Sequence, residues 1–274
     1  MQQPNIGFIG AGNMARSLIG GLFKKNAQTN IFACDPSEDQ LALLTKSLDY
    51  PDGLTTSTDN SFISNSDIIL LAVKPQIMQA VATEIQSHIK PGALVISIAA
   101  GISIRSLENW LGEIAIVRCM PNTPALVQQG ATGLFANSRV SNEQRTSAET
   151  ILSAVGISCW VESENLIDVV TAVSGSGPAY FFLFTELIAE IGAEMGLERD
   201  VAETLAKQTF LGAGLLASES QDNLATLRKN VTSPGGTTER AIDRFVSDDL
   251  KTAVKNAMQD CAGRADAMSK EFGV

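Results

Sequence analysis

Histidine and cysteine are scarce in this sequence of 274 residues, and their scarcity limits the chemistry available to it. His88 is the only histidine, so a Ser-His-Asp triad is excluded except around His88, and a metal site with several histidines is impossible. The cysteines form no CxxC pair; they are Cys34, Cys119, Cys159 and Cys261. This spacing favours reduced thiols over a disulfide framework or a zinc site, so we predict no bound metal.

Basic residues are also few, with 20 Lys and Arg against 30 Asp and Glu and a formal net charge of −10. This charge argues against a broad nucleic-acid or anionic-membrane surface, so anionic ligands must be held by local features. Uninterrupted apolar runs are short, such as residues 68–73, whereas about 20 apolar residues are needed to cross a bilayer. We therefore predict neither a membrane span nor a nucleic-acid partner. No signal peptide is indicated, which makes a cytoplasmic location the default expectation.

Strand-like and helical runs alternate through the first part of the chain. The strand-like runs lie at residues 6–9, 30–34, 67–73, 93–98 and 114–119. Most are continuously apolar, as is typical of parallel strands buried on both faces under helices. We therefore predict an α/β fold that begins with a Rossmann-like doubly wound sheet. Two later runs, 133–136 and 157–161, can extend the sheet edge, with a helix at 142–155 between them.

The second part of the chain has helical periodicity throughout. Residues 178–196 are apolar on most faces, and a helix of this kind must be covered on nearly all sides. We therefore predict a dinucleotide-binding domain at 1–164 and an all-α helical-bundle domain at 165–274. The helical domain is expected to form a homodimer; the alternative is a compact monomeric bundle.

A glycine-rich motif stands where the first strand ends and the first helix begins. Its residues are Gly10, Ala11, Gly12, Asn13, Met14 and Ala15. They fit the GxGxxG/A pattern, in which the first glycine allows a tight turn and the second lets the backbone approach a diphosphate. The helix N-terminus then offers N–H donors to the phosphates, so we predict a dinucleotide site. A plain tight turn is the alternative.

Asp35 ends the second predicted strand, twenty residues beyond Ala15. An acidic side chain at this place commonly accepts hydrogen bonds from the adenosine ribose. Residues 36–44 contain no Arg or Lys to receive a 2′-phosphate, and both observations favour NADH. The alternative is a capping role at the N-terminus of the next helix.

Three further segments follow predicted strands, at the edge where open α/β sheets bind ligands. Lys74 can contribute charge near a cofactor, and Pro75 suits the first turn of a helix. Ala99 and Ala100 leave room for a bound ring, and Asn122 lies in a rigid proline-containing turn. Taken singly, each segment is better explained as an ordinary loop.

Two polar segments interrupt the apolar helices, at residues 174–178 and 231–238, and both precede predicted helices. The second can bind a small carboxylate through the backbone N–H groups of Gly236 and Thr237. Hydroxyls of Thr237 or Thr238 would add hydrogen bonds. The alternative is ordinary helix capping by serine and threonine.

Six segments, in order and spacing, resemble those of the pyrroline-5-carboxylate reductase family over the full length of the chain. They are residues 8–15, 72–75, 97–101, 118–124, 173–180 and 232–238, of which the last is the most specific. The resemblance implies hydride transfer from NAD(P)H to the C=N bond of 1-pyrroline-5-carboxylate, giving L-proline. It also implies an active site shared between the Rossmann domain of one subunit and the helical domain of its mate, in dimers or rings of five dimers.

The resemblance also implies roles for particular residues. Besides the glycine loop, the cofactor is expected to contact Asn60, Ala72, Val73, Lys74, Pro75, Ala99 and Ala100, to which we add Asn122 and Asp35. The substrate carboxylate is expected at Ser233, Gly236 and Thr237, with Thr238 near the ring nitrogen as the candidate catalytic residue. NADPH is the expected cofactor on resemblance, and NADH remains possible because of Asp35.

Two other functions stay open from the sequence. A β-hydroxyacid dehydrogenase would need a catalytic lysine in its helical part, but the first lysine after residues 174–178 is Lys207, well into the following helices. A nucleotide-sensing regulator without turnover is the alternative outside enzymes. The reductase needs no strong general base, since a protonated imine is already an electrophile and the protein mainly orients two bound rings.

Overall fold

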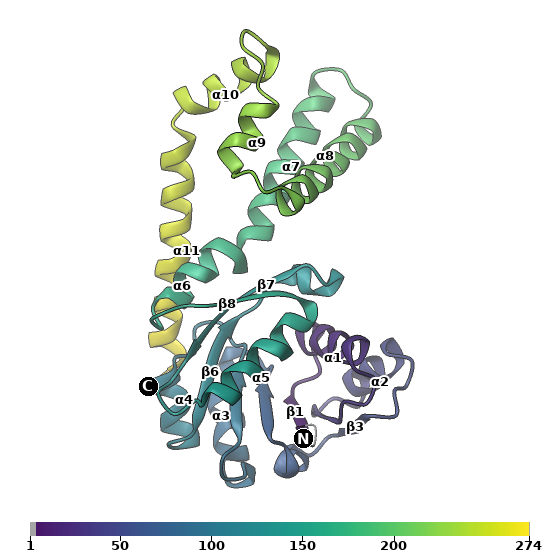
Figure 1. Cartoon of the computed structure of the whole chain (residues 1–274), viewed down its shortest axis with the longest axis vertical. Helices are drawn as coiled ribbons and strands as arrows, with labels where there is room; N and C mark the ends of the chain where they lie inside the picture. Colours follow the sequence, from purple (N-terminus) through teal and green to yellow (C-terminus); the bar gives the residue numbers. More distant parts are fainter. Residues whose placement is uncertain (1–3, 274) are drawn as a thin grey trace. The chain divides into compact units, whose positions relative to one another are not determined.

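The computed structural model describes residues 4–273 and divides into two compact units (Figure 1). The first unit takes in the chain up to Ser176 together with the residues from Asp260 onward, and the second is Gly177–Gln259. These two units differ in their bounds from the predicted domains, and the domain ranges 1–164 and 165–274 stay a prediction.

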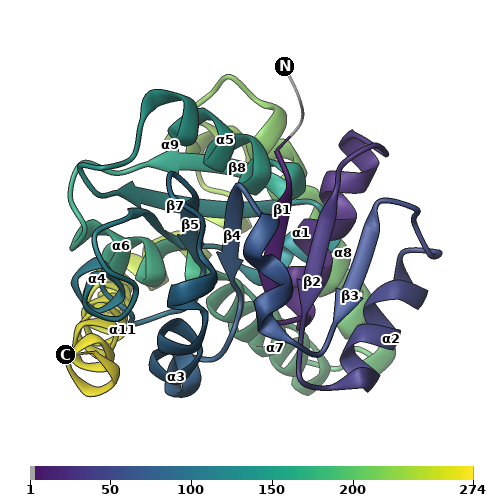
Figure 2. The same cartoon turned by 90° about the horizontal axis from the view of Figure 1, so that it is seen from below.

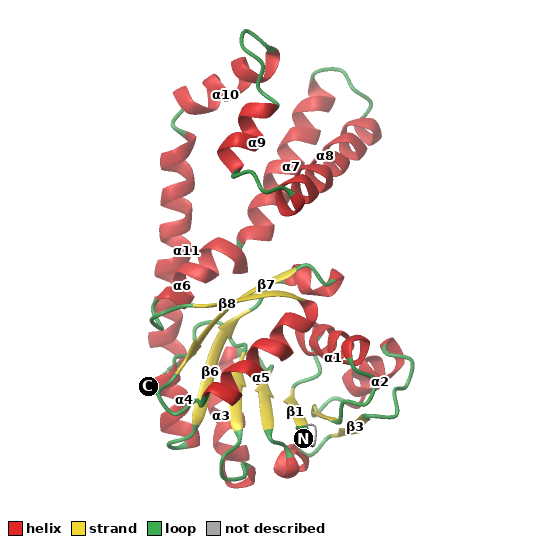
Figure 3. Cartoon of the chain, viewed as in Figure 1, coloured by secondary structure: helices red, strands yellow, loops and turns green. Residues whose placement is uncertain are grey.

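An eight-stranded sheet forms the centre of the first unit (Figure 3). Its strands are β1 (Ile6–Ile9), β2 (Ile31–Cys34), β3 (Leu54–Ser57), β4 (Ile68–Leu71), β5 (Leu94–Ser97), β6 (Ala115–Met120), β7 (Gly130–Ala136) and β8 (Gly156–Trp160). Their order is β3-β2-β1-β4-β5-β6-β7-β8, and only the β6–β7 pair is antiparallel. The order reverses between β1 and β4, which is where open α/β sheets bind ligands. The predicted doubly wound sheet is confirmed.

Helices of the first unit cover both faces of the sheet (Figure 2). They are α1 (Asn13–Lys25), α2 (Glu38–Ser47), α3 (Pro75–Ile85), α4 (Ile104–Leu111), α5 (Asn142–Leu152) and α6 (Leu166–Val170). Buried side chains of α1, α2 and α5 join one core, and those of α3 and α4 join another. Strand β1 serves both, because Phe8 points into the first core and Ile9 into the second. Alternation of this kind explains why its sequence is apolar without interruption.

The second unit is helical throughout. Its helices are α7 (Gly177–Glu194), α8 (Arg199–Glu219), α9 (Leu224–Asn230), α10 (Thr237–Ser247) and the first part of α11 (Leu250–Phe272). Large apolar side chains of α7 remain 50% exposed or more, among them Phe181, Phe182, Leu183, Ile188 and Ile191. A monomeric bundle would bury such side chains, so these helices need a covering surface.

The segment Leu166–Glu194, of 29 residues, has the length and composition of a membrane span, because an 18-residue window within it has a mean hydropathy of 1.4. Only 17% of its most apolar window is buried within the chain. It is not one regular helix, because a π-helical turn at Thr171–Gly175 separates α6 from α7. An apolar helix that is buried only at a subunit interface has the same length and composition. The expected absence of a membrane span stays a prediction.

Candidate dinucleotide and substrate sites

Gly10 makes the turn that leads from β1 into the glycine loop. Its φ of +98° is a left-handed conformation that favours glycine, and its N–H donates to Cys34 O at 2.7 Å. A Cβ at this position would lie 2.6 Å from Ala72 O, at the end of the neighbouring β4. The tight turn and the close approach of the two strands therefore both require glycine here.

Gly12 is the N-cap of α1, and no side chain caps this helix end. A Cβ built on Gly12 would meet no atom within 4 Å, so the space beside this end of α1 is open. Ala11 and Ala15, on either side, are buried in the core. Free N–H donors beside an unobstructed backbone are what a diphosphate requires, and these residues therefore fit a dinucleotide.

The carboxylate of Asp35 joins the glycine loop to the start of α2. Its Oδ2 accepts the Ala11 N–H at 2.8 Å, and its Oδ1 accepts the Ser37 N–H at 2.9 Å. Ser37, not Asp35, is the N-cap of α2, since its Oγ accepts the Gln40 N–H at 3.3 Å. Each carboxylate oxygen has a second lone pair, so the ribose contact stays a prediction beside this structural role.

Removing the Asp35 carboxylate is expected to weaken the binding of both nucleotides. In an Asp35→Ala variant the Ala11 N–H loses a charge-assisted hydrogen bond, so the KM for NADPH and the KM for NADH should each rise about tenfold. Steady-state kinetics with each nucleotide measure this, with Asp39→Ala, an exposed first-turn carboxylate of α2, as the control. A rise confined to NADH would show that the carboxylate acts on the ribose instead.

Asn60 presents a buried acceptor without a partner. It begins a short 3₁₀ helix, Asn60–Asn65, and its Nδ2 donates to Glu84 Oε1 at 3.2 Å. This bond fixes the amide so that Oδ1 is enclosed with no hydrogen-bond donor among the described residues. A buried acceptor without a donor is uncommon in proteins, but an enclosed oxygen is also out of reach of a ligand, so the contact of Asn60 with the cofactor stays a prediction.

The segment that follows β4 begins helix α3, whereas the segment that follows β5 packs against the end of α11. Lys74 is the exposed N-cap of α3 and Pro75 is its first residue, as the sequence predicts. After β5, the Ala99 N–H donates weakly to Ser97 Oγ at 3.4 Å. A Cβ on Gly101 would lie 2.6 Å from Met268 Cβ, so this glycine makes room for the end of α11. Of the small residues after β5, Ala100 is half-buried and Ala99 is buried in the core, so their contact with a bound ring stays a prediction.

Asn122, expected at the cofactor, has both ends of its amide occupied by the chain itself. Its Nδ2 donates to Ser174 O at 3.0 Å, and its Oδ1 accepts the Ala131 N–H at 2.9 Å. The residue is 8% exposed. It therefore connects β7 to the π-helical turn, and a contact with the cofactor stays a prediction.

Residues 174–178 do not form the simple helix N-terminus expected from the sequence. The chain is already helical before them, and the Ser176 N–H donates to Thr171 O at 2.8 Å, five residues back. A Cβ on Gly175 would lie 2.7 Å from Met120 Cε, so the π-helical turn packs closely on the end of β6. Single π-helical turns are frequent at functional sites.

A buried ion-pair cluster escaped the sequence reasoning. Arg118, only 3% exposed, donates to Glu164 Oε1 at 3.0 Å and to Asp168 Oδ1 at 2.8 Å. Glu164 also accepts the Ile104 N–H at 2.7 Å, at the start of α4. An arginine within an otherwise apolar strand was the available signal, but its partners are 46 and 50 residues away. The cluster therefore connects α6 and the residues before it to β6.

Neither buried thiol of the sheet can act as a nucleophile near neutral pH. Burial, with a smaller effect of the Asp59 charge, raises the pKa of the Cys34 thiol to about 12. Burial also raises the pKa of the Cys119 thiol. A thiol that stays protonated is a poor nucleophile and metal ligand. Within residues 4–273 no group of three or more His, Cys, Asp or Glu side chains is placed to hold a metal ion.

In the segment before α10 in the second unit, the sequence predicts a carboxylate at the N–H groups of Gly236 and Thr237, but the Gly236 N–H already donates to Ser233 O at 3.0 Å. Gly235 has a φ of +71°, and its N–H donates to Glu239 Oε2 at 2.7 Å. Gly236 is the N-cap of α10 and no side chain caps this end, so ordinary capping by serine or threonine does not explain the segment. Thr237 and Thr238 begin the helix and are exposed. The arrangement suits a small carboxylate.

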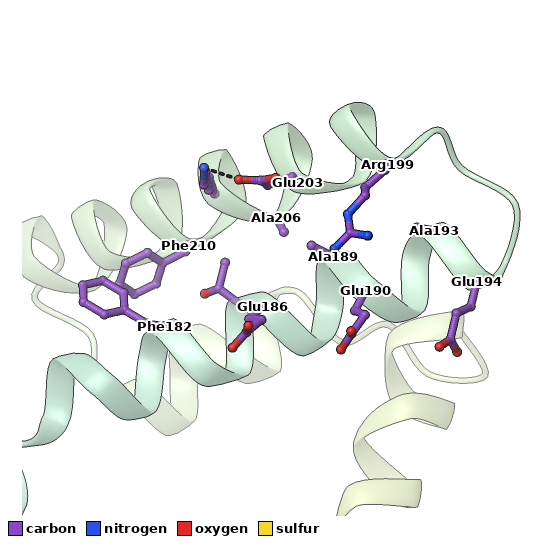
Figure 4. Close-up of a pocket in the computed structure, with 12 residues that line it drawn as sticks. Phe182, Glu186, Ala189, Glu190, Ala193, Glu194, Arg199, Glu203, Ala206 and Phe210 are labelled. Carbon is purple, nitrogen blue, oxygen red and sulfur yellow. Dashed lines mark hydrogen bonds and ion pairs between the residues drawn. The ribbon is translucent and has the colours of Figure 1, made fainter.

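The cavity between α7 and α8 is a different feature (Figure 4). Its volume is about 720 Å³, and none of the predicted site residues lines it. Phe182 and Phe210 stand at one end, while Glu186, Glu190 and Glu194 follow one side of α7. Because it lies among exposed apolar helices, we assign it to the uncovered surface of the second unit.

Comparison with known proteins decides the family. The chain is 45% identical to the pyrroline-5-carboxylate reductase of Pseudomonas aeruginosa over 100% of both chains. It is 40% identical to that of Methanosarcina acetivorans, over 100% of this chain and 99% of the relative. The chain belongs to the pyrroline-5-carboxylate reductase family. It is accordingly an oxidoreductase of proline biosynthesis, and the predicted family, fold and enzyme class are confirmed.

Solved pyrroline-5-carboxylate reductases share the fold. The structure from Coxiella burnetii is 42% identical with a TM-score of 0.92, covering 98% of this chain and 99% of that one. The structure from Plasmodium falciparum, solved with NADP bound, is 31% identical with a TM-score of 0.82 and the same coverage. Residues 5–101 also match the family described as NADP oxidoreductase coenzyme F420-dependent. An NAD(P)-dependent Rossmann fold follows.

The exposed helices are explained by a further match. Residues 164–268 match the family described as pyrroline-5-carboxylate reductase dimerisation. This range includes α7 and α8, whose apolar side chains lie open in the single chain. The reductase therefore assembles into homo-oligomers, and the predicted association is confirmed at that level.

Proposed function

We propose that this reductase transfers a hydride from NADPH to the carbon of the C=N bond in 1-pyrroline-5-carboxylate, giving L-proline. The observation that carries the proposal is the identity to pyrroline-5-carboxylate reductases over the whole chain. NADH is the second choice of cofactor. The reduced nicotinamide, when bound, supplies the hydride, and the ring nitrogen carries the proton that completes the amine.

The protein's part in the reaction is to bind and orient two rings. The uncapped N-terminus of α1 at Gly12 supports holding the diphosphate there, and Asn60 is expected beside the cofactor. Ala72 to Pro75 and Ala99 to Ala100 would border the rest of the cofactor. The Thr237 N–H, with Ser233 and Gly236, would hold the substrate carboxylate, and the Gly236 N–H would exchange its bond to Ser233 O for the ligand. Thr238 Oγ1 would hydrogen-bond the ring nitrogen.

The assembly and location are part of the same proposal. We infer a dimer whose active site combines the Rossmann domain of one subunit with the helical domain of its mate, and assembly into decamers. The enzyme is expected in the cytoplasm, without a membrane or nucleic-acid partner. The dimerisation family match and the exposed apolar helices support the association of subunits.

Mixing the protein with reduced nucleotide and pyrroline-5-carboxylate tests the activity directly. Absorbance of the reduced nicotinamide should fall only when protein and both substrates are present, and proline should accumulate in equal amount. Nucleotide binding without any turnover would support the non-catalytic sensor instead. A β-hydroxy acid oxidised in place of the imine would support a dehydrogenase.

Removing the Thr238 hydroxyl is expected to slow the reaction. Thr238→Ala should lower kcat/KM for pyrroline-5-carboxylate up to about tenfold, the effect of one neutral hydrogen bond. Thr238→Ser keeps the hydroxyl and should stay within about twofold of the wild type. Full catalytic efficiency in Thr238→Ala would remove this residue from the mechanism.

A further inference from the structure

Arg16 is a cation on α1, outside the segment after β2 that contains no Arg or Lys. It is the fourth residue of α1, one turn beyond the glycine loop. Its Nη1 donates to Gln40 Oε1 at 3.5 Å, and its Nη2 donates to Asn13 Oδ1. Gln40 is the third residue of α2. The guanidinium therefore lies between the first turns of the two helices that follow β1 and β2.

The partners of Arg16 leave its charge available. Both are neutral amide oxygens, and no carboxylate of the described chain forms an ion pair with this guanidinium, unlike Arg118, which lies between two carboxylates. A guanidinium has five N–H donors, of which the amide oxygens use two. Arg16 is half-buried, so its field is less screened than that of a fully exposed cation.

Arg16 lies near the expected position of the adenosine ribose, where NADPH and NADH differ. In Rossmann folds the adenosine ribose lies beyond the end of the second strand, and NADPH differs from NADH only in a phosphate on the ribose 2′-oxygen. The Arg16 guanidinium reaches that end of the sheet through its contact with Gln40. The Asp35 carboxylate is already engaged by the N–H groups of Ala11 and Ser37, which offsets part of its charge.

We propose that Arg16 recognises the 2′-phosphate of NADPH and thereby determines the nucleotide preference of this enzyme. The inference rests on the proposed function, and it answers why residues 36–44 contain no cation: α1 supplies one from the other side. A planar guanidinium can donate two parallel N–H bonds to one phosphate, which an ammonium group cannot. Glu38 and Asp39 oppose the phosphate, but both are exposed to solvent, which weakens their repulsion.

Binding of two nucleotide fragments to the full-length protein tests the proposal. Calorimetric titration with 2′,5′-ADP and with 5′-ADP compares ligands that differ by the 2′-phosphate alone. Arg16→Gln should raise the Kd for 2′,5′-ADP roughly 10- to 100-fold, the range for lost charge-assisted hydrogen bonds, and change the Kd for 5′-ADP less than about threefold. Arg16→Lys should give an intermediate Kd for 2′,5′-ADP.

Lys24→Gln is the matched control, because it makes the same charge change at an exposed position in the last turn of α1. It should leave the ratio of the two Kd values unchanged. Equal wild-type affinity for the two fragments overturns the proposal, as does an Arg16→Gln variant that keeps its preference for 2′,5′-ADP.

The titration needs no turnover, so it separates the two proposals. A protein that fails to reduce pyrroline-5-carboxylate but loses 2′,5′-ADP selectivity on Arg16→Gln refutes the proposed reaction and supports the role of Arg16. In an active enzyme, the KM for NADPH should rise with that substitution much more than the KM for NADH.

Discussion

A Gly12→Val variant is expected to fold normally and to lose roughly 100- to 10,000-fold in nucleotide affinity. The N-cap φ of −69° and ψ of −176° are accessible to any residue, and a Cβ there meets no atom within 4 Å. Valine would instead fill the space in front of the free N–H groups of α1. Loss of two hydrogen bonds to a charged diphosphate, at about 1.5–3 kcal/mol each, gives the expected range.

Gly10→Ala provides the contrasting variant. Its Cβ would lie 2.6 Å from Ala72 O on a backbone with φ of +98°, so the cost falls on the fold and is about 2–3 kcal/mol in the free energy of unfolding. Urea unfolding and NADPH titration of both variants measure the two effects separately. If Gly12→Val bound the dinucleotide as the wild type does, the phosphate site would not be at α1.

Replacing Arg118 by methionine is expected to lower the free energy of unfolding by about 3 kcal/mol. The substitution leaves the carboxylates of Glu164 and Asp168 without their cation in a largely buried position. Because these carboxylates fasten α6 beside the π-helical turn, catalytic efficiency should fall as well. Urea unfolding of the first unit, followed by the fluorescence of Trp110 and Trp160, measures the loss of stability.

Two controls make this prediction specific. Arg139→Met removes an exposed arginine from its pairs with Glu108 and Glu113, and the free energy of unfolding should change far less than in Arg118→Met, because solvent screens exposed ion pairs. Combining Arg118→Met with Glu164→Gln and Asp168→Asn removes the unpaired charges and should recover part of the stability. A triple variant no more stable than Arg118→Met alone would mean that packing, not charge, explains the loss.

The strands that sequence reasoning located are those whose pattern is local and strong. The first five predicted apolar runs form strands within two residues at each end, because burial on both faces leaves no room for polar residues. The two later runs also lie in strands, but β7 begins at Gly130, three residues before the predicted run 133–136. β3 was missed because Leu54–Ser57 carries two threonines and a serine at the sheet edge, where one neighbour is solvent. The glycine loop was found because its glycines meet steric demands visible in sequence.

The remaining site features depend on partners distant in the chain. The pairs of Arg118, the occupied amide of Asn122 and the contact between Gly101 and Met268 each join residues far apart in sequence. Arg16 shows the same limit, since its position near α2 follows from a contact with Gln40 across 24 residues. Local sequence patterns therefore predict where the backbone needs a particular conformation, but they do not predict which side chains distant in sequence contact each other.

The open apolar side chains of α7 and α8 tie the stability of this enzyme to its abundance. If those side chains become buried only when two copies meet, folding of the helical half obeys mass action, and its free energy gains about 1.4 kcal/mol for each tenfold rise in total chain. Dilution would then act as a denaturant. A cell that makes little of this protein would hold more of it incompletely folded, with Phe181 and Phe182 exposed to chaperones and proteases.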